Sequence, residues 1–262
     1  MATSGPYLQT VDRALQVLLQ FDEAHPEWSA AELAQQLGLH RSIVYRILAT
    51  LERRGFVTQA DRRGRFRLGL KLVELGNVVL ANMDLRQVAH PVMERLVRET
   101  GESAFLTVVS GDESVCVDKI DSPQPIRVTL TLGGRSPLHA GASNKILLAY
   151  LPPKAIDAYI AKGLEQITPD TITDPQQLKE ELAQIRKQGW AYSVGELTPG
   201  VAAMAVPLRN SNGEVVAGLS IANLASRFSE DRRPMLIQKL REAADEISAQ
   251  LLVWHTAQSP SS

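Results

Sequence analysis

The chain has 262 residues, of which 44% are hydrophobic and 22% are charged. That length suffices for two domains of roughly 100–200 residues each, and the composition is typical of a globular protein with a substantial core. The single cysteine, Cys116, excludes an internal disulfide framework and suits a reducing compartment. The sequence begins with no signal-peptide pattern, and no apolar run approaches the ~20 residues of a membrane span, so we expect a cytoplasmic protein.

The overall charge of −1 is unevenly distributed along the sequence. Residues 41–71 contain nine arginines and lysines but only two acidic residues, a net of +7, which leaves −8 on the rest of the chain. A basic block inside a nearly neutral protein indicates an anionic partner for that segment. Charge alone leaves a solvated charged surface as an equal alternative.

Three helices are predicted before and within this block. Residues 10–21 carry apolar side chains at helical spacing after Thr10, a natural N-cap. Ser29 and Glu32 form the capping-box pattern of a second helix, which Gly38 ends. The third helix, from residue 41 to about 55, has an apolar side made of Ile43, Val44, Ile47, Leu48 and Leu51.

The opposite side of the third helix is polar and basic. A short helix, a tight turn containing glycine and a second helix of this kind are typical of a helix-turn-helix, whose second helix enters the major groove of DNA. The predicted DNA-contacting residues of this helix are Arg41, Ser42, Tyr45 and Arg46. Arginine can bind guanine O6 and N7 together, and serine or tyrosine can bind bases or phosphates.

Residues 56–68 predict a β-hairpin with a polar turn at residues 61–64. Arg62, Arg63 and Arg65 lie at this turn, where they could meet phosphates or the minor groove. Helix-turn-helix and hairpin together predict a winged helix. A winged helix used for protein contacts is the alternative, and the density of arginines favours DNA.

The segment 69–83 has a helical pattern with a break near residues 82–84. Leu70, Val73, Val78 and Val79 form an apolar stripe with nothing nearby in the sequence to cover it. The stripe could pack on a partner helix or on the adjacent domain. Homodimerisation is the favoured interpretation, because operator symmetry commonly mirrors a two-fold axis of the protein.

After residue 103 the pattern changes to short strands. Strands are predicted at 104–110, 114–121, 126–133, 190–196, 201–210 and 214–224. Helices are predicted from near Gly141, from Thr173 or Asp174 to Gly189, and from about residue 230 to 255. The fold class is therefore α+β, with a winged helix-turn-helix followed by a domain built on an antiparallel sheet.

Five segments in this order resemble one known family. Residues 8–21, 33–57 and 64–76 resemble the DNA-binding half, and residues 130–152 and 189–229 the effector-binding half, of the IclR family of bacterial transcription factors. The resemblance implies a winged helix over residues 1–68, a linker helix over 69–83, and a GAF-like α/β effector-binding domain over 84–262. It also implies dimers or tetramers on double-stranded DNA.

The resemblance carries an effector pocket onto particular residues. Ala140, Gly141 and Ala142 match one wall, where the start of a helix can present backbone N–H groups to an anion. The opposite wall matches Glu196, Ala203, Met204, Ser220 and Ala222. Several relatives have acidic residues near Ser193 and a cysteine in place of Ala203, so this pocket has fewer polar anchors. A larger or partly apolar carboxylate is favoured over a small dicarboxylate.

The cluster His139, Ser143 and Lys145 raises the alternative of an enzyme. Its spacing matches neither the G-x-S-x-G nor the S-x-x-K pattern, and no nearby carboxylate could orient the histidine. The five histidines show no metal-ligand spacing with one another or with Cys116. We interpret His139 and Lys145 as structural, while Ser220 could equally be a pocket residue or a sheet residue bonded locally.

The sequence thus predicts a DNA-binding transcriptional regulator, a repressor rather than an activator, whose operator affinity is controlled by a small organic acid. No catalytic residue, metal site or cofactor is expected. The alternatives are an enzyme, or a ligand-independent DNA-binding protein, that uses the same winged helix.

Overall fold

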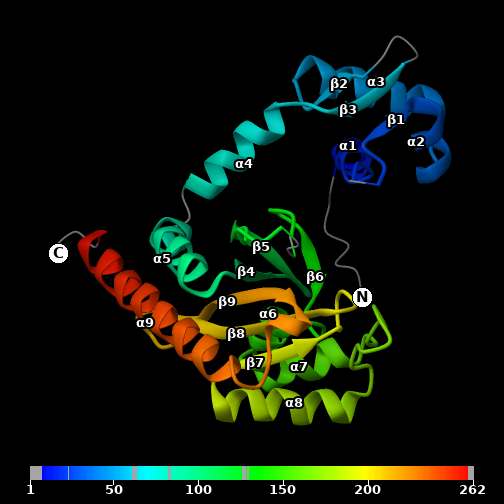
Figure 1. Cartoon of the computed structure of the whole chain (residues 1–262). Helices are drawn as coiled ribbons and strands as arrows, with labels where there is room; N and C mark the ends of the chain where they lie inside the picture. The colour runs from blue at the N-terminus through cyan, green and yellow to red at the C-terminus, as the bar shows by residue number, and fades with distance from the viewer. Residues whose placement is uncertain are drawn as a thin grey trace. The chain divides into compact units, whose positions relative to one another are not determined.

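The computed structural model describes residues 8–258 except residues 23, 61–63, 82–83, 126–127 and 129. The chain divides into two compact units, residues 1–82 and residues 83–262, which are described separately (Figure 1). Within the described ranges, no helix is both long enough and apolar enough to cross a membrane.

The N-terminal unit is a three-helix core with a small antiparallel sheet and a further helix. Its elements are α1 (Gln9–Leu18), β1 (Glu27–Ser29), α2 (Ala30–Leu37), α3 (Arg41–Arg53), β2 (Val57–Gln59), β3 (Arg65–Leu68) and α4 (Lys71–Ala81). The sheet order is β1-β3-β2. The side chains of Val17, Leu33, Val44, Leu48 and Phe66 fill the core between the helices and the sheet. This arrangement is the predicted winged helix-turn-helix.

Local sequence signals explain the ends of α2. Ser29 and Glu32 form the predicted capping box, with Glu32 N–H donating to Ser29 Oγ and Ser29 N–H donating to Glu32 Oε2. Gly38 ends the helix in the left-handed region at φ 63°, as predicted. Strand β1 was not predicted, because three residues directly before a helix cap are too few to show an alternating pattern.

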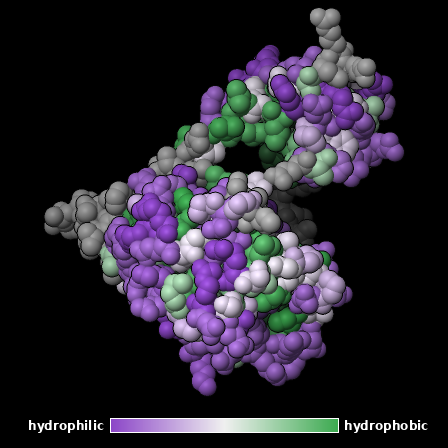
Figure 2. All heavy atoms as spheres, viewed as in Figure 1, coloured by the Kyte–Doolittle hydropathy of each residue, from purple (hydrophilic) through white to green (hydrophobic). Residues whose placement is uncertain are grey.

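Two apolar stripes of this unit remain exposed. The apolar residues predicted for α1 divide between two faces, because Ala14 and Leu18 pack on the core while Val11, Leu15 and Leu19 are exposed. Helix α1 also begins at Gln9, one residue before the predicted cap Thr10. Around α4, Leu70, Val73 and Val78 are exposed as predicted for the linker stripe, whereas the side chain of Val79 lies outside the described ones. Leu75, which was not predicted to belong to the stripe, is exposed as well, and Figure 2 shows hydrophobic residues on the surface of this unit.

The C-terminal unit is built on a six-stranded antiparallel sheet in the order β6-β5-β4-β9-β8-β7. The strands are β4 (Ser103–Ser110), β5 (Glu113–Ile120), β6 (Arg135–Pro137), β7 (Ala191–Val194), β8 (Val201–Arg209) and β9 (Val215–Leu224). The helices are α5 (Asp84–Thr100), α6 (Ala142–Ala149), α7 (Pro153–Ile160), α8 (Pro175–Gln188) and α9 (Arg233–Gln258), with a short 3₁₀ turn η1 (Ala225–Arg227).

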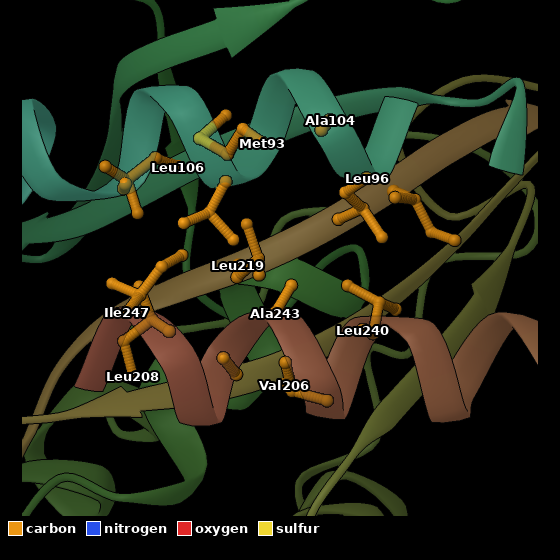
Figure 3. Close-up of a cluster of buried hydrophobic side chains, with 14 of the residues drawn as sticks. Met93, Leu96, Ala104, Leu106, Val206, Leu208, Leu219, Leu240, Ala243 and Ile247 are labelled. Atoms are coloured by element: carbon orange, nitrogen blue, oxygen red, sulfur yellow. The ribbon is translucent and has the colours of Figure 1, made fainter. Parts of the chain in front are cut away.

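The two faces of this sheet are covered differently. Helices α5 and α9 cover one face, and Figure 3 shows Met93 and Leu96 of α5 and Leu240 and Ile247 of α9 directed toward Leu219. Helix α6 packs on the opposite face, with α7 and α8 beyond it. At Gly218 the sheet approaches α6 so closely that an added Cβ would lie 3.0 Å from Ile146 Cγ2. This second face also carries the cavities described below.

One sequence prediction in this unit is wrong, and one helix was missed. The described residues of the predicted strand 126–133 form no strand, and the sheet instead gains β6 at Arg135–Pro137. Helix α7 was not predicted, although Pro153 stands at its first position, where a missing N–H costs nothing. The predicted cap of α8 is Asp174, whose side chain accepts from Gln177 N–H.

Replacing Leu219 by alanine tests the assigned core. Leu219 is fully buried on β9 between α5 and α9, so Leu219→Ala should lower the free energy of unfolding by about 2–5 kcal/mol. Val109 on β4 is 37% exposed, and Val109→Ala should cost less than about 1 kcal/mol. Urea denaturation of both variants measures the difference, and equal losses would contradict the core assignment.

Candidate functional site

Helix α3 separates an apolar face from a polar one. Val44, Ile47 and Leu48 are buried in the core of the N-terminal unit. The four predicted DNA-contacting residues of the helix, Arg41, Ser42, Tyr45 and Arg46, are all exposed, with Tyr45 at 62%. The helix therefore presents one continuous basic and hydroxyl-bearing surface that begins at its N-terminus.

His40 is a functional candidate that the sequence analysis missed. It is the N-cap of α3, and its Nδ1 lies 2.8 Å from Ser42 Oγ and 3.4 Å from Ser42 N. Serine, threonine, aspartate and asparagine are the usual N-caps, so a histidine before a helix gave no clear capping signal. The imidazole thus contacts both the side chain and the backbone of an exposed serine in the first turn of α3.

Of the three predicted wing arginines, the structure describes Arg65 alone. Its guanidinium donates to the carbonyl of Glu27 at 2.8 Å and to Glu32 Oε1 at 3.3 Å. Arg65 therefore connects β3 to β1 and to the capping carboxylate of α2, a contact between residues more than thirty positions apart that the sequence did not suggest. Arg62 and Arg63 lie outside the described residues.

The second candidate region is a cavity between α6 and the sheet, with about 490 Å³ of space, part of it open to solvent. Six predicted effector residues line it: Gly141, Ala142, Glu196, Ala203, Ser220 and Ala222. Its apolar wall includes Phe105, Leu130, Leu197 and Val201. Residues from five separate parts of the chain thus meet around one space, as an effector site requires.

Two predicted effector residues lie elsewhere. Met204 is fully buried in the core under α5 and α9, because successive residues of a strand point to opposite faces and Ala203 takes the cavity side. Ala140 is also fully buried, and its carbonyl accepts from Asn144 Nδ2 at 2.6 Å. Both residues support the walls of the cavity from behind without lining it.

The first two amides of α6 already have protein partners. Gly141 N–H donates to Glu196 Oε2 at 2.8 Å, and Ala142 N–H donates to Ser193 Oγ at 2.9 Å. Glu196 Oε1 accepts from Lys145 Nζ at 2.6 Å, and Lys145 also donates to Glu181 at 3.0 Å. The amides predicted to bind an anion are therefore occupied, and the carboxylate of Glu196 acts as an internal anion at the helix start.

Other polar groups at the cavity remain available for a ligand. Among the described residues, the next two amides of α6, those of Ser143 and Asn144, have no hydrogen-bond acceptor. The hydroxyls of Ser143 and Ser220 likewise have no partner in the described part of the chain, although both residues are more than nine-tenths buried. Neither hydroxyl oxygen is completely enclosed, since in the described part of the chain the fully buried side-chain atom without a partner is Arg86 Nε, so both hydroxyls are open to a polar ligand atom or to water.

A second, more polar cavity of about 640 Å³ adjoins the first. Leu130, Ser143 and Leu197 line both. Across the second cavity, Ser114 Oγ donates to Asn144 Oδ1 at 2.6 Å, and Cys116 lies nearby on β5. Burial raises the pKa of the Cys116 thiol to about 11, the nearby Asp118 carboxylate adding to the effect, so the thiol stays protonated near neutral pH.

The histidine and lysine of the apparent catalytic cluster have structural partners. His139 is buried, with Nδ1 2.7 Å from the Tyr159 hydroxyl and Nε2 2.9 Å from the carbonyl oxygen of Glu165. Burial raises the pKa of Tyr159, which keeps that hydroxyl protonated. Lys145 is committed to its two carboxylates. Within the described residues, no three side chains of the metal-ligating types gather at one point.

Comparison with known proteins defines the class of both units. The IclR helix-turn-helix domain matches residues 10–61, and the bacterial transcriptional regulator IclR C-terminal domain matches residues 77–249. The HTH-type transcriptional regulator KipR of Bacillus subtilis is 38% identical over 227 residues, covering 86% of this chain and 90% of that protein. The transcriptional repressor IclR of Escherichia coli is 30% identical over 244 residues, covering 92% and 89%.

Solved structures agree with this assignment. An IclR homologue from Microbacterium hydrocarbonoxydans, crystallised in complex with 4-hydroxybenzoate, superposes with a TM-score of 0.81 at 28% identity and covers 93% of this chain and 99% of its own. A winged helix-turn-helix joined to an α+β domain defines a helix-turn-helix transcriptional regulator. The chain belongs to the IclR family of bacterial transcriptional regulators.

The reactivity of Cys116 tests the burial of its thiol beside the second cavity. Its raised pKa and its 3% exposure should make alkylation by iodoacetamide at pH 8 on the order of 100-fold slower in the folded protein than in the urea-unfolded chain. Mass spectrometry gives a direct readout, because the chain has one cysteine. Equal rates in the two states would contradict this placement of the thiol.

Proposed function

We propose that the protein is a repressor that binds a specific operator through α3 and the wing and releases or tightens that binding when a small organic acid occupies the α6 cavity. The observation that carries the proposal is the cavity between α6 and the sheet, where the Ser143 amide and the hydroxyls of Ser143 and Ser220 have no partner among the described residues. In this proposal the helix-turn-helix binds the operator, and the cavity binds the organic acid that controls it.

The exposed surface of α3 supports sequence-specific binding. Arg41 and Arg46 can each bind guanine with two hydrogen bonds, and Tyr45 can contact a base or a phosphate. We assign Arg62 and Arg63 to contacts with the DNA backbone, while Arg65 contributes chiefly by holding the wing against α2. Non-specific attraction comes from the positive charge of residues 41–71.

The cavity favours a carboxylate with an apolar body. Phe105, Leu130 and Ala222 offer apolar contacts to such a body, while the Ser143 amide at the start of α6 and the Ser220 hydroxyl suit a carboxylate. The homologue that holds 4-hydroxybenzoate is consistent with this class of ligand. We assign Gly141, Ala142, Ser143, Ala203, Ser220 and Ala222 to the effector site, with Glu196 as its structural support.

The exposed apolar residues of the N-terminal unit support self-association. Leu8, Val11, Leu15 and Leu19 follow α1 at helical spacing, and Leu70 and Val73 accompany the start of α4. Exposed apolar stripes of this length commonly mark protein–protein contacts. We propose a homodimer, or a tetramer built from dimers, on a two-fold symmetric operator in the cytoplasm.

Regulation requires that the ligand bind the two functional states unequally. A difference of about 1–3 kcal/mol between the DNA-binding state and the other state would change operator occupancy about 5–150-fold. We propose no catalytic activity, because His139 and Lys145 are fully engaged in structural contacts. A regulator needs no chemical step, since differential binding alone moves the equilibrium.

Two measurements test this function together. A mobility shift with DNA from upstream of the protein's own gene, with and without a panel of aromatic and aliphatic carboxylates, tests operator binding and its control. Thermal unfolding with the same panel tests the cavity, because a ligand at 100 times its Kd stabilises the fold by about 2.7 kcal/mol. Ligand consumption would favour an enzyme, and sequence-independent DNA binding without any ligand effect would favour an architectural protein.

Arg46→Ala and Arg63→Ala should weaken DNA binding in different ways. Arg46→Ala should cost about 1–3 kcal/mol on the operator and relax discrimination at one base pair, because it removes a base contact. Arg63→Ala should weaken binding to all DNA about equally and reduce the salt dependence by about one phosphate contact. Titrations of operator and unrelated duplex at several salt concentrations separate the two, and unchanged operator affinity of Arg46→Ala would refute its role.

Two serines of the cavity wall form a matched pair. Ser220→Ala should weaken binding of the most stabilising carboxylate about fivefold, the value of one hydrogen bond, without loss of stability, because its hydroxyl has no partner among the described residues. Ser193→Ala should instead lower the free energy of unfolding by about 1 kcal/mol, because the Ala142 amide loses its acceptor. Calorimetric titration and urea denaturation measure both, and unchanged ligand affinity in Ser220→Ala would exclude Ser220 from the site.

A further inference from the structure

We propose that His40 orients the hydroxyl of Ser42 so that Ser42 reads a base with an exocyclic amino group, adenine or cytosine, in the major groove. The inference rests on the proposed entry of α3 into that groove. It makes His40 a positioning residue of the DNA-binding surface, and it makes Ser42 a hydrogen-bond acceptor toward the base.

The hydroxyl and the backbone nitrogen of Ser42 both lie near one nitrogen of the His40 ring. The Ser42 hydroxyl oxygen lies 2.8 Å from Nδ1, and the Ser42 backbone nitrogen lies 3.4 Å from the same atom. His40 has the extended backbone of an N-cap, with φ −69° and ψ 135°, which directs its side chain back over the first turn of α3. The same ring therefore caps the helix and orients the exposed hydroxyl of Ser42.

The position of the ring proton follows from this convergence. A nitrogen that accepts from the Ser42 N–H cannot itself carry a hydrogen, so in the neutral ring the proton is on Nε2. The Ser42 hydroxyl hydrogen is then directed to Nδ1 as well. What Ser42 presents away from the helix is the pair of lone pairs on its oxygen, so it acts toward DNA as an acceptor.

An acceptor at this position discriminates among the groups of the major groove. Adenine N6 and cytosine N4 offer hydrogens there, whereas guanine N7 and O6, thymine O4 and phosphate oxygens only accept. Ser42 therefore suits adenine or cytosine and not a phosphate. Arg41 beside it and Arg46 one turn further along α3 carry only donors and suit guanine, so the same helix face has both polarities.

The test begins with the operator that the full-length protein selects from random DNA duplexes. At each adenine or cytosine of that operator, the base is then replaced by purine or by 2-pyrimidinone, which lack the exocyclic amino group. Binding of the wild type and of Ser42→Ala, His40→Ala and His40→Asn is measured at pH 8, the upper end of the range over which imidazoles normally gain a proton. Ser29→Ala, which removes the N-cap of the neighbouring α2, is the matched control for lost capping.

We expect one position at which removal of the amino group weakens wild-type binding on the order of fivefold, as for one hydrogen bond. Ser42→Ala should be insensitive to that removal, and His40→Ala should lose most of the sensitivity. The double variant should show no loss of discrimination beyond that of Ser42→Ala, since the two residues act as one unit. His40→Asn should retain discrimination, because an asparagine cap also offers an acceptor, and Ser29→Ala should retain it despite its lower stability.

Three results would overturn the inference. One is a Ser42→Ala variant that keeps the wild-type sensitivity at every position. Another is a uniform loss on all DNA, whatever its sequence, which would make Ser42 a phosphate contact. The third is full discrimination by His40→Ala. If the wild type selects no sequence at all, the proposed function itself fails, and this outcome is recognised before any variant is measured.

Discussion

The carboxylate of Glu196 is the contact on which the C-terminal unit depends. It accepts from the Gly141 amide and from Lys145, and so joins the loop after β7 to the first turn of α6. Lys145 is almost completely buried, and it extends the connection to Glu181 on α8. Removing either charge would leave the other buried without its partner, which is far more costly than the loss of a surface ion pair. Gly141 and Glu196 both line the cavity, so this contact joins two parts of its wall.

The antiparallel sheet connects that cavity to the hydrophobic core. On β8, Ala203 faces the cavity and Met204 faces α5 and α9, and on β9 the same alternation separates Ser220 from Leu219. A ligand that changes the cavity face therefore acts on strands whose other face is packed against the two long helices. Helix α5 follows α4 directly in the chain, so the layer packed on the far face of the sheet is also the part of this unit nearest in sequence to the N-terminal unit.

Sequence patterns predicted what local chemistry determines, and they failed where distant residues decide. The capping box at Ser29, the terminal Gly38 and the cap Asp174 needed only their neighbours. The occupation of the Gly141 amide by Glu196, 55 residues away, had no local signal, and neither had the contact of Arg65 with Glu32. Met204 was misplaced because the resemblance indicated a strand segment, while the face of each residue depends on the register with β9. His40 lacked a signal because histidine is an uncommon cap.

The crowded and the open parts of the cavity wall differ in which side chains they tolerate. Gly141 has φ 87°, and an added Cβ would lie 2.7 Å from Leu197 Cδ1, so this position requires glycine. Ala203 and Ala222 instead face the empty space, where a larger side chain would shorten the cavity without disturbing a hydrogen bond. Single substitutions on the sheet can therefore change the shape of this space while the first turn of α6 and its anion stay unchanged. The residues that hold the cavity wall in place are separate from those that set the size of the space between α6 and the sheet.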